Sequence, residues 1–219
     1  MIIIFGDSIV QGAFDSECGG WVSRLAAHHN KLSLNGGAKT QVANLGISGD
    51  DICGIIKRFA NELEVRLHDD RESLVVIAVG INDSKVHIET GKSQTPIVDF
   101  KETLKEIIKK AKQYPNLQIV CMGLLSINQS QLDPLPWGPE VAYRESEVKR
   151  FNSAIEETAK EEEIPFIPLH DVFGERYKDL LPDGLHPNAE GHKLIFERVK
   201  EYLEKLNLIP KPYPLPPIP

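Results

Sequence analysis

The sequence predicts an α/β protein, a three-layer α/β/α sandwich around a five-stranded parallel sheet. Three observations lead to this prediction. Short apolar runs alternate with longer amphipathic stretches over residues 1–209. Two of the runs, SLVVIAVG and LQIVCMGLL, are continuously apolar, which is typical of strands buried on both faces. Each run is followed by a helical pattern, and such connections form right-handed crossovers between parallel strands.

The expected elements follow in order along the chain. Strands are expected at 2–5, 41–48, 73–80, 117–125 and 165–170, and helices at 19–29, 50–67, 99–114, 143–162 and 188–206. Pro115 ends the third helix, and Asn188 is the expected N-cap of the last one. The connections 83–98 and 126–142 are longer than usual for this fold class, which favours a functional role for them.

A single domain is expected over residues 1–209, followed by a proline-rich tail at 210–219. The tail is too rich in proline for a helix or a sheet and should adopt polyproline II. Tyr213, Leu215 and Ile218 alternate with the prolines and give the segment apolar surface to bury. We therefore expect the tail to lie against a protein surface, and on a neighbouring subunit it would strap a homodimer together.

Composition and charge exclude several classes of protein. The formal net charge is −7 and the chain has no basic cluster, which argues against nucleic acid or an anionic membrane as a partner. The opening Met-Ile-Ile-Ile is predicted to be a strand rather than a signal peptide, and no apolar run is long enough to span a membrane. Three widely spaced cysteines predict no disulfide framework, so a cytoplasmic location is expected. No metal-ligand spacing is present, and we expect neither a metal nor a cofactor.

Polar, chemistry-bearing segments stand at the ends of the expected strands. These segments are FGDSI, NLGISGD, VGINDS and, beyond the last strand, LPDGLHPN. Ligands of open α/β sheets bind outside the carboxyl ends of the strands, so the four segments should meet at one edge. They supply a serine, glycine-rich backbone, a carboxamide and an Asp-x-x-His pair. Together these are the parts needed for acyl transfer: a nucleophile, a base with its orienting carboxylate, and oxyanion donors.

Each segment alone also has a purely structural interpretation. Ser8 could simply cap a helix, and Asn82 could be a turn residue. Gly46 and Gly49 could serve a tight strand-to-helix connection. The structural interpretations are less convincing when the four segments are considered together. Unrelated turns would have no reason to supply a complementary set of catalytic groups in the right order.

The four segments resemble the sequence blocks of the GDSL lipase/esterase family, also called SGNH hydrolases. FGDSIVQG matches the first block, NLGISGD the second, GIND the third and DGLHPN the fifth. The resemblance implies a flavodoxin-like fold and hydrolysis of carboxylic esters. It also implies that Ser8 is the nucleophile, that His186 is the base and that Asp183 orients it. The oxyanion would be held by the N–H groups of Ser8 and Gly46 and by the amide of Asn82.

Other residues near these blocks receive more modest assignments. His170 ends the last expected strand and is the only serious competitor for the base. Asp7 and Asp83 are interpreted as structural carboxylates that bind local backbone N–H groups. In the connection 126–142, the apolar Leu132, Leu135 and Trp137 are expected to form part of the substrate pocket.

Three functions remain open at this point. The first is a serine esterase that acts on small-molecule acyl esters of unknown chain length. The second is a dedicated deacetylase of sugar or small-metabolite esters. The third, from a different class, is a non-catalytic binding domain on the same scaffold, which the completeness of the catalytic positions disfavours.

Overall fold

A parallel sheet forms the centre of the protein in the computed structural model, which describes residues 1–34, 40–67 and 71–209. The five strands lie in the order β2-β1-β3-β5-β7, and every neighbouring pair is parallel. This order confirms the predicted fold class and the five-stranded sheet. The strand bounds are Ile2–Gly6 (β1), Val42–Gly46 (β2), Ser73–Ala78 (β3), Leu117–Met122 (β5) and Phe166–Ile167 (β7).

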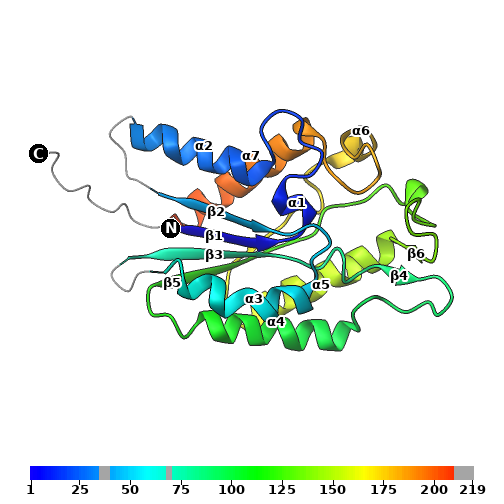
Figure 1. Cartoon of the computed structure of the whole chain (residues 1–219), viewed down its shortest axis with the longest axis horizontal. Coiled ribbons are helices and arrows are strands. Elements are labelled where there is room, and N and C mark those ends of the chain that lie inside the picture. Colours follow the sequence, from blue (N-terminus) through cyan, green and yellow to red (C-terminus); the bar gives the residue numbers. More distant parts are fainter. Residues whose placement is uncertain (35–39, 68–70, 210–219) are drawn as a thin grey trace, which may run out of the picture.

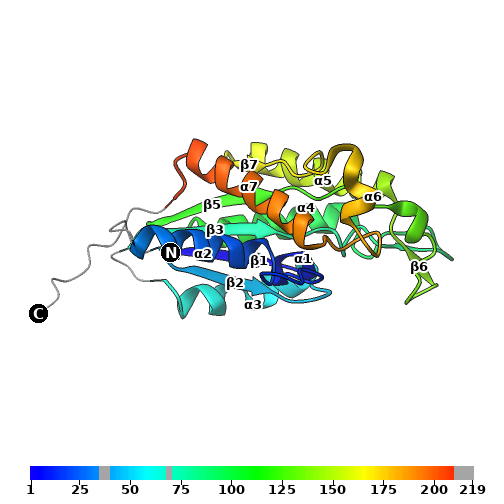
Figure 2. The same cartoon turned by 90° about the horizontal axis from the view of Figure 1, so that it is seen from above.

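Helices cover both faces of the sheet and complete the three layers (Figures 1 and 2). On one face lie α2 and α7, and on the other lie α3, α4 and α5. Their bounds are Trp21–Leu34 (α2), Ile52–Glu64 (α3), Ile97–Ala111 (α4), Glu145–Glu161 (α5) and Ala189–Lys205 (α7). Asn188 caps α7 as predicted, because its side chain accepts a hydrogen bond from the Gly191 N–H.

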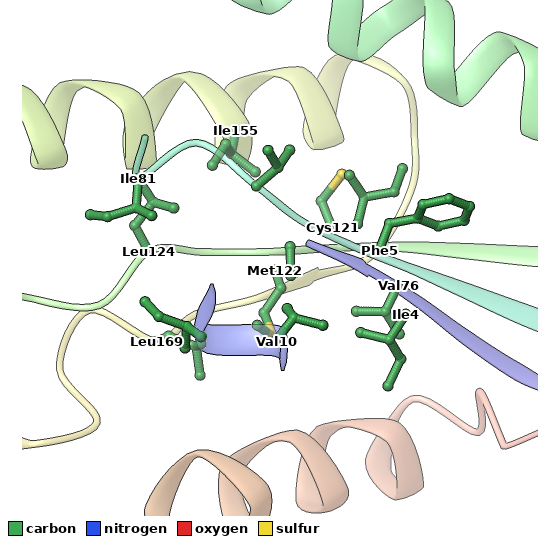
Figure 3. Packing of buried hydrophobic residues seen from close by; sticks show 14 of the residues in the cluster. Ile4, Phe5, Val10, Val76, Ile81, Cys121, Met122, Leu124, Ile155 and Leu169 are labelled. Atoms are coloured by element: carbon green, nitrogen blue, oxygen red, sulfur yellow. The ribbon is translucent and has the colours of Figure 1, made fainter. Parts of the chain in front are cut away.

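The core lies on both faces of the central strands. All five residues of β1 and all six of β3 are buried, which explains why these runs lack any polar alternation. Figure 3 shows the alternation of side chains across the sheet, with Ile4 and Val76 on one face and Phe5 and Cys121 on the other. This rigid sheet is the platform on which the strand-end segments are held.

The strand order reverses between β1 and β3, and the helix α1 (Ser8–Gln11) begins at this point. In parallel sheets such a switch point opens a crevice for ligands. A Cβ at Gly6 would collide with the Val10 side chain and the Ala78 carbonyl. Glycine is therefore required here for α1 to lie close against the strand end.

The two long connections contain structure that the sequence analysis does not predict. Val86–His87 (β4) and Val141–Ala142 (β6) pair as antiparallel strands, with Val86 opposite Ala142. The connection after β7 contains the short helix α6 (Tyr177–Leu180). Two-residue strands are too short to show a periodic pattern, so no sequence signal marks them.

Further predictions concern membrane insertion, disulfides and the tail. None of the helices in the described part of the chain is long and apolar enough to cross a membrane. All three cysteines are free thiols. The tail at 210–219 lies outside the described residues, so its docking, the homodimer strap and the domain boundary at 209 stay predictions.

Candidate active site

Ser8 is the first residue of α1, directly beyond the end of β1. Asp7 is the N-cap of α1, and its carboxylate accepts a hydrogen bond of 2.9 Å from the Ile9 N–H. Burial raises the pKa of Asp7 to about 6. The N–H of Ser8 stays free of the helix because the first amides of a helix have no intrahelical acceptor. At the switch point of the sheet, Ser8 thus carries a hydroxyl and an N–H that has no acceptor among the described residues.

Ser8, His186 and Asp183 form a continuous hydrogen-bonded chain. The Ser8 Oγ lies 2.9 Å from the Nε2 of His186, and the Nδ1 of His186 lies 2.6 Å from the Oδ2 of Asp183. The other carboxylate oxygen of Asp183 accepts hydrogen bonds from the N–H groups of Leu185 and His186, at 2.9 and 2.7 Å. An ionised Asp183 holds the proton on Nδ1, so Nε2 can accept the hydroxyl proton of Ser8.

The environment of Asp183 favours its charged form. Burial acts to raise the pKa of this carboxyl, but the hydrogen bonds from the His186 ring and from the two backbone N–H groups bring it below its ordinary value. Asp183 is therefore suited to orient the imidazole and to stabilise the imidazolium that forms when His186 takes up a proton.

His170 is engaged elsewhere. Its Nε2 lies 2.8 Å from Glu145 Oε1, at the start of α5. The hydrogen bond to Glu145 also contributes to lowering the pKa of that carboxyl, against the effect of its burial. The geometry therefore places His186, and not His170, beside the serine.

Asn82 is held from both ends of its amide group. Its Nδ2 donates to the Asp50 carbonyl at 2.9 Å, and its Oδ1 accepts from the Tyr143 hydroxyl at 2.8 Å. Since the carbonyl end of the amide is fixed by Tyr143, the amide cannot flip without losing this bond. The second hydrogen on Nδ2 is left to donate to a ligand.

The sequence analysis misses Tyr143, which lies 61 residues away from Asn82. Burial is the main cause of the raised pKa of its phenol, so the hydroxyl keeps the proton that it donates to Asn82. No motif marks this tyrosine, because the contact arises only when the segment before α5 meets the loop after β3.

Of Gly46, which ends β2, and Gly49, which follows it, only Gly49 offers an N–H without a partner among the described residues. The Gly46 N–H already donates to Asn44 Oδ1 at 2.9 Å, and a Cβ on Gly46 would collide with the Gln11 backbone. Gly46 is therefore a close-packing position under α1. Gly49 has a φ of 81° and open space around it, and its N–H has no partner among the described residues. The candidate backbone donor to the oxyanion in this segment is therefore the N–H of Gly49 and not, as expected, the N–H of Gly46.

Asp83 binds a backbone N–H, as the structural interpretation expects, but this N–H belongs to a distant helix start and not to a residue nearby in the sequence. Its two oxygens accept from the Ile52 N–H at 3.2 and 3.1 Å, and one also accepts from the Thr95 hydroxyl at 2.6 Å. Burial raises the pKa of Asp83 to about 7. Asp83 thereby ties the loop after β3 to the first turn of α3.

The expected pocket residues in the connection 126–142 do not behave alike. Leu132 is 0% exposed and Leu135 is 4% exposed, and both pack in the core. Their side chains stabilise the base of the loop, so they are not free to contact a substrate. Trp137 is 56% exposed and is the one of the three that remains available for such a contact.

A cavity of about 20 Å³ lies next to α1, lined mainly by apolar residues that include Ile9, Val10, Met122 and Leu169. This volume suits a single water molecule and is too small for an ester. Ser8 and His186, which meet at 2.9 Å, are not among the residues that line this cavity.

Comparison with known proteins agrees with this fold and identifies a family. The model of the GDSL-like lipase/acylhydrolase family matches residues 4–194, and the chain belongs to this family. The protein is therefore an enzyme that hydrolyses acyl esters, as the resemblance of its sequence blocks implies.

Curated relatives cover nearly the whole chain. The isoamyl acetate-hydrolyzing esterase 1 homolog of Bos taurus is 25% identical over an alignment of 219 positions. The alignment covers 93% of this chain and 81% of the relative. The isoamyl acetate-hydrolyzing esterase of Saccharomyces cerevisiae is 22% identical over 217 residues, covering 92% and 85%. Among solved structures, an acetylxylan esterase from Geobacillus stearothermophilus superposes with a TM-score of 0.68 at 19% identity, covering 94% of this chain and 93% of that chain. This last likeness shows a shared fold.

Proposed function

We propose that the protein is a serine esterase in which Ser8, His186 and Asp183 form the catalytic triad. The observation that carries the proposal is the chain of hydrogen bonds from Ser8 Oγ through the imidazole to Asp183, at 2.9 and 2.6 Å. Ser8 Oγ attacks the acyl carbon while its proton passes to His186 Nε2. The C–O bond to the alcohol then breaks, and the alcohol leaves with that proton.

Water completes the reaction by the same route in reverse. His186 Nε2 takes a proton from a water molecule, whose oxygen attacks the acyl group on Ser8, and the proton returns to Ser8 Oγ as the carboxylic acid departs. In both halves of the reaction, negative charge develops on the former carbonyl oxygen. We assign its stabilisation to the free N–H groups of Ser8 and Gly49 and to the second Nδ2 hydrogen of Asn82.

An ester of a short acyl group is the substrate class that the observations favour. The curated relatives from cattle and yeast are named for hydrolysis of isoamyl acetate. The alternative, removal of acetyl groups from sugars, finds support in the structural likeness to an acetylxylan esterase. The cytoplasmic location and the homodimer stay predictions alongside this proposal.

A substrate profile separates these alternatives. We expect activity on alkyl acetates and a decline with acyl chains longer than about four carbons, measured as kcat/KM. A preference for acetylated sugars over alkyl acetates by more than tenfold would favour the deacetylase instead.

In the same assay, Trp137→Ala should change the ratio between short and long acyl chains several-fold. An unchanged ratio would remove Trp137 from the substrate pocket.

A double-mutant cycle on Asn82 and Tyr143 tests the oxyanion assignment. Asn82→Ala should lower kcat by about 10²- to 10³-fold, as the loss of one oxyanion donor does elsewhere. Tyr143→Phe keeps the ring but frees the amide to flip, and should lower kcat by about tenfold with little change in KM. If Tyr143 acts through Asn82, the Tyr143→Phe substitution should cost less than about twofold in the Asn82→Ala background. Additive losses would show that Tyr143 does not act by holding the amide.

A further inference from the structure

Phe14 has an unusual combination of features beside the proposed base. Its ring lies parallel to the imidazole of His186, with centroids 5.1 Å apart and planes 5° apart. The residue is nevertheless 56% exposed. Its backbone has a φ of 67°, in the left-handed region that residues other than glycine rarely adopt. Because so much of Phe14 stays in water, its burial does not offset the free-energy cost of this backbone conformation.

The backbone on both sides of Phe14 is fixed by hydrogen bonds. The Ala13 N–H donates to the Ser8 carbonyl at 2.9 Å, and the Ala13 carbonyl accepts from His192 Nε2 at 2.9 Å. His192 is 0% exposed and lies in α7, and its Nδ1 accepts from the Trp21 N–H at 3.3 Å. The segment that leads into Phe14 is thus tied to both α1 and α7.

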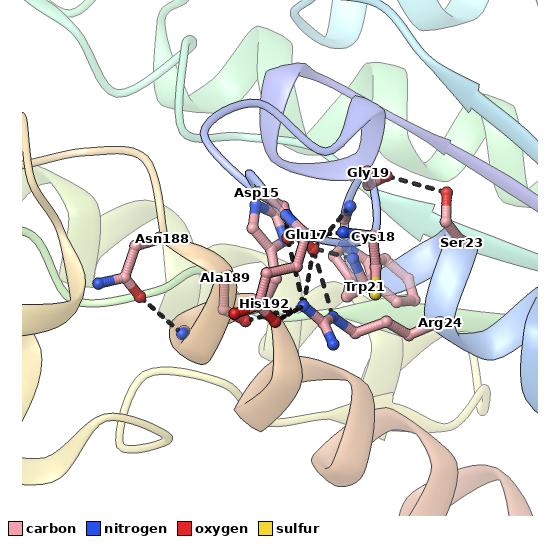
Figure 4. A network of polar contacts seen from close by, with 12 residues as sticks. Asp15, Glu17, Cys18, Gly19, Trp21, Ser23, Arg24, Asn188, Ala189 and His192 are labelled. Carbon is pink, nitrogen blue, oxygen red and sulfur yellow. Dashed lines mark hydrogen bonds and ion pairs between the residues drawn. The ribbon is translucent and has the colours of Figure 1, made fainter.

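The segment after Phe14 is held just as firmly (Figure 4). The side chain of Asp15 is fully buried and accepts hydrogen bonds from the N–H groups of Glu17, Cys18 and Gly20. Arg24 of α2 pairs with Asp15 at 3.1 Å and also donates to the Ala189 carbonyl at 3.2 Å, where α7 begins. His186 lies just before α7. The contacts of Arg24 with Asp15 and with the start of α7 therefore position both Phe14 and the imidazole.

We propose that Phe14 is the specificity-determining residue for the alcohol part of the ester, and that its exposed ring face receives an apolar alkyl chain. This inference rests on the proposed function and deepens it. When the alcohol leaves, its oxygen takes the proton from His186 Nε2 and must lie within hydrogen-bond distance of that atom. The carbon chain of the alcohol therefore extends from a point at the edge of the imidazole.

Parallel rings at a centroid distance of 5.1 Å are offset, so part of the Phe14 face extends beyond the imidazole. An alkyl chain that leaves the edge of His186 can lie on this exposed part and remove apolar surface from water. A polyol such as a sugar has little apolar surface to place there and would lose hydrogen bonds to water. The preferred substrates are accordingly esters of apolar alcohols.

The test keeps the acyl group constant and varies the alcohol. Ethyl, butyl and hexyl acetate, together with a monoacetylated sugar, are compared by kcat/KM for the wild type, Phe14→Ala and Phe14→Trp. The wild type should prefer hexyl over ethyl acetate by about tenfold or more. Phe14→Ala should reduce this preference to about twofold, and Phe14→Trp should retain it. Val65→Ala is the matched control, since Val65 is 75% exposed at the end of α3 and should not alter the profile.

A second series keeps the alcohol constant and varies the acyl chain, and here Phe14→Ala should leave the relative rates unchanged. If Phe14→Ala lowers all acetates equally, or changes the acyl series instead, the assignment to the alcohol side is overturned. These outcomes differ from failure of the proposed function, in which the wild type itself would hydrolyse none of the esters.

Melting temperatures distinguish this role from a structural one. Phe14→Gly removes the ring and relieves the left-handed backbone, so it should melt at least as high as Phe14→Ala while losing the same alcohol preference. A structural role predicts instead that both variants melt well below the wild type and that the alcohol preference persists in both. That result would overturn the proposal.

Discussion

Replacing Ser8 by Ala should lower kcat on p-nitrophenyl acetate by at least about 10⁴-fold and leave the fold intact. The residue supplies the attacking oxygen, and no other hydroxyl is hydrogen-bonded to His186 in the described part of the chain. The loss of one hydroxyl leaves the packing of α1 unchanged, because Asp7 provides the cap and Gly6 provides the close approach.

Circular dichroism and the melting temperature serve as the controls for the fold of this variant. Ser23→Ala is a matched substitution, since Ser23 Oγ donates to the Gly19 carbonyl at 2.9 Å in an exposed position. It should retain near-normal turnover. Turnover by Ser8→Ala well above the uncatalysed rate, with a normal spectrum, would show that Ser8 is not the nucleophile.

The second large effect is expected at His186. His186→Gln removes the group that takes the proton from Ser8 and returns it to the alcohol, and kcat should fall by roughly 10³-fold or more. His170→Gln is the matched control, because His170 also pairs with a carboxylate, at 2.8 Å, but lies apart from the serine. It should change kcat by less than about threefold. The reverse order of the two losses would contradict the assignment of the base.

Much of the fold and of the candidate site could be predicted from the sequence, for physical reasons. Strands buried on both faces must be continuously apolar, and β1 and β3 therefore stand out. The sheet topology then brings the ends of these strands to one edge, so that residues as distant as Ser8 and His186 could be placed together before any contact was known. The short Asp-x-x-His spacing likewise matches the observed pairing of Asp183 with His186.

What could not be predicted depends on contacts between distant segments or on individual backbone angles. Choosing between Gly46 and Gly49 requires knowing that Asn44 already accepts the Gly46 N–H. The contact of Tyr143 with Asn82 joins two loops that no local pattern relates. The left-handed backbone of Phe14 is imposed by its neighbours, because a phenylalanine has no intrinsic preference for it.

The burial of Leu135, which the sequence analysis expects to face a substrate, has a similar origin. An apolar residue in a long loop can either face a substrate or anchor the loop in the core. The sequence does not distinguish these cases. The Leu135 N–H donates to the Val141 carbonyl at 2.9 Å, which folds the loop back on itself; Leu135 is buried there, while Trp137 remains exposed.

The central claim is that Ser8 is a nucleophile activated by His186, and covalent labelling tests it most directly. A fluorophosphonate reacts with an activated serine and leaves a stable adduct on its oxygen. Intact mass spectrometry of the wild type should show a single adduct, and peptide mapping should locate it on Ser8. Ser8→Ala should remain unlabelled, and His186→Gln should react far more slowly. An adduct on another residue, or equal labelling of Ser8→Ala, would contradict the proposed mechanism.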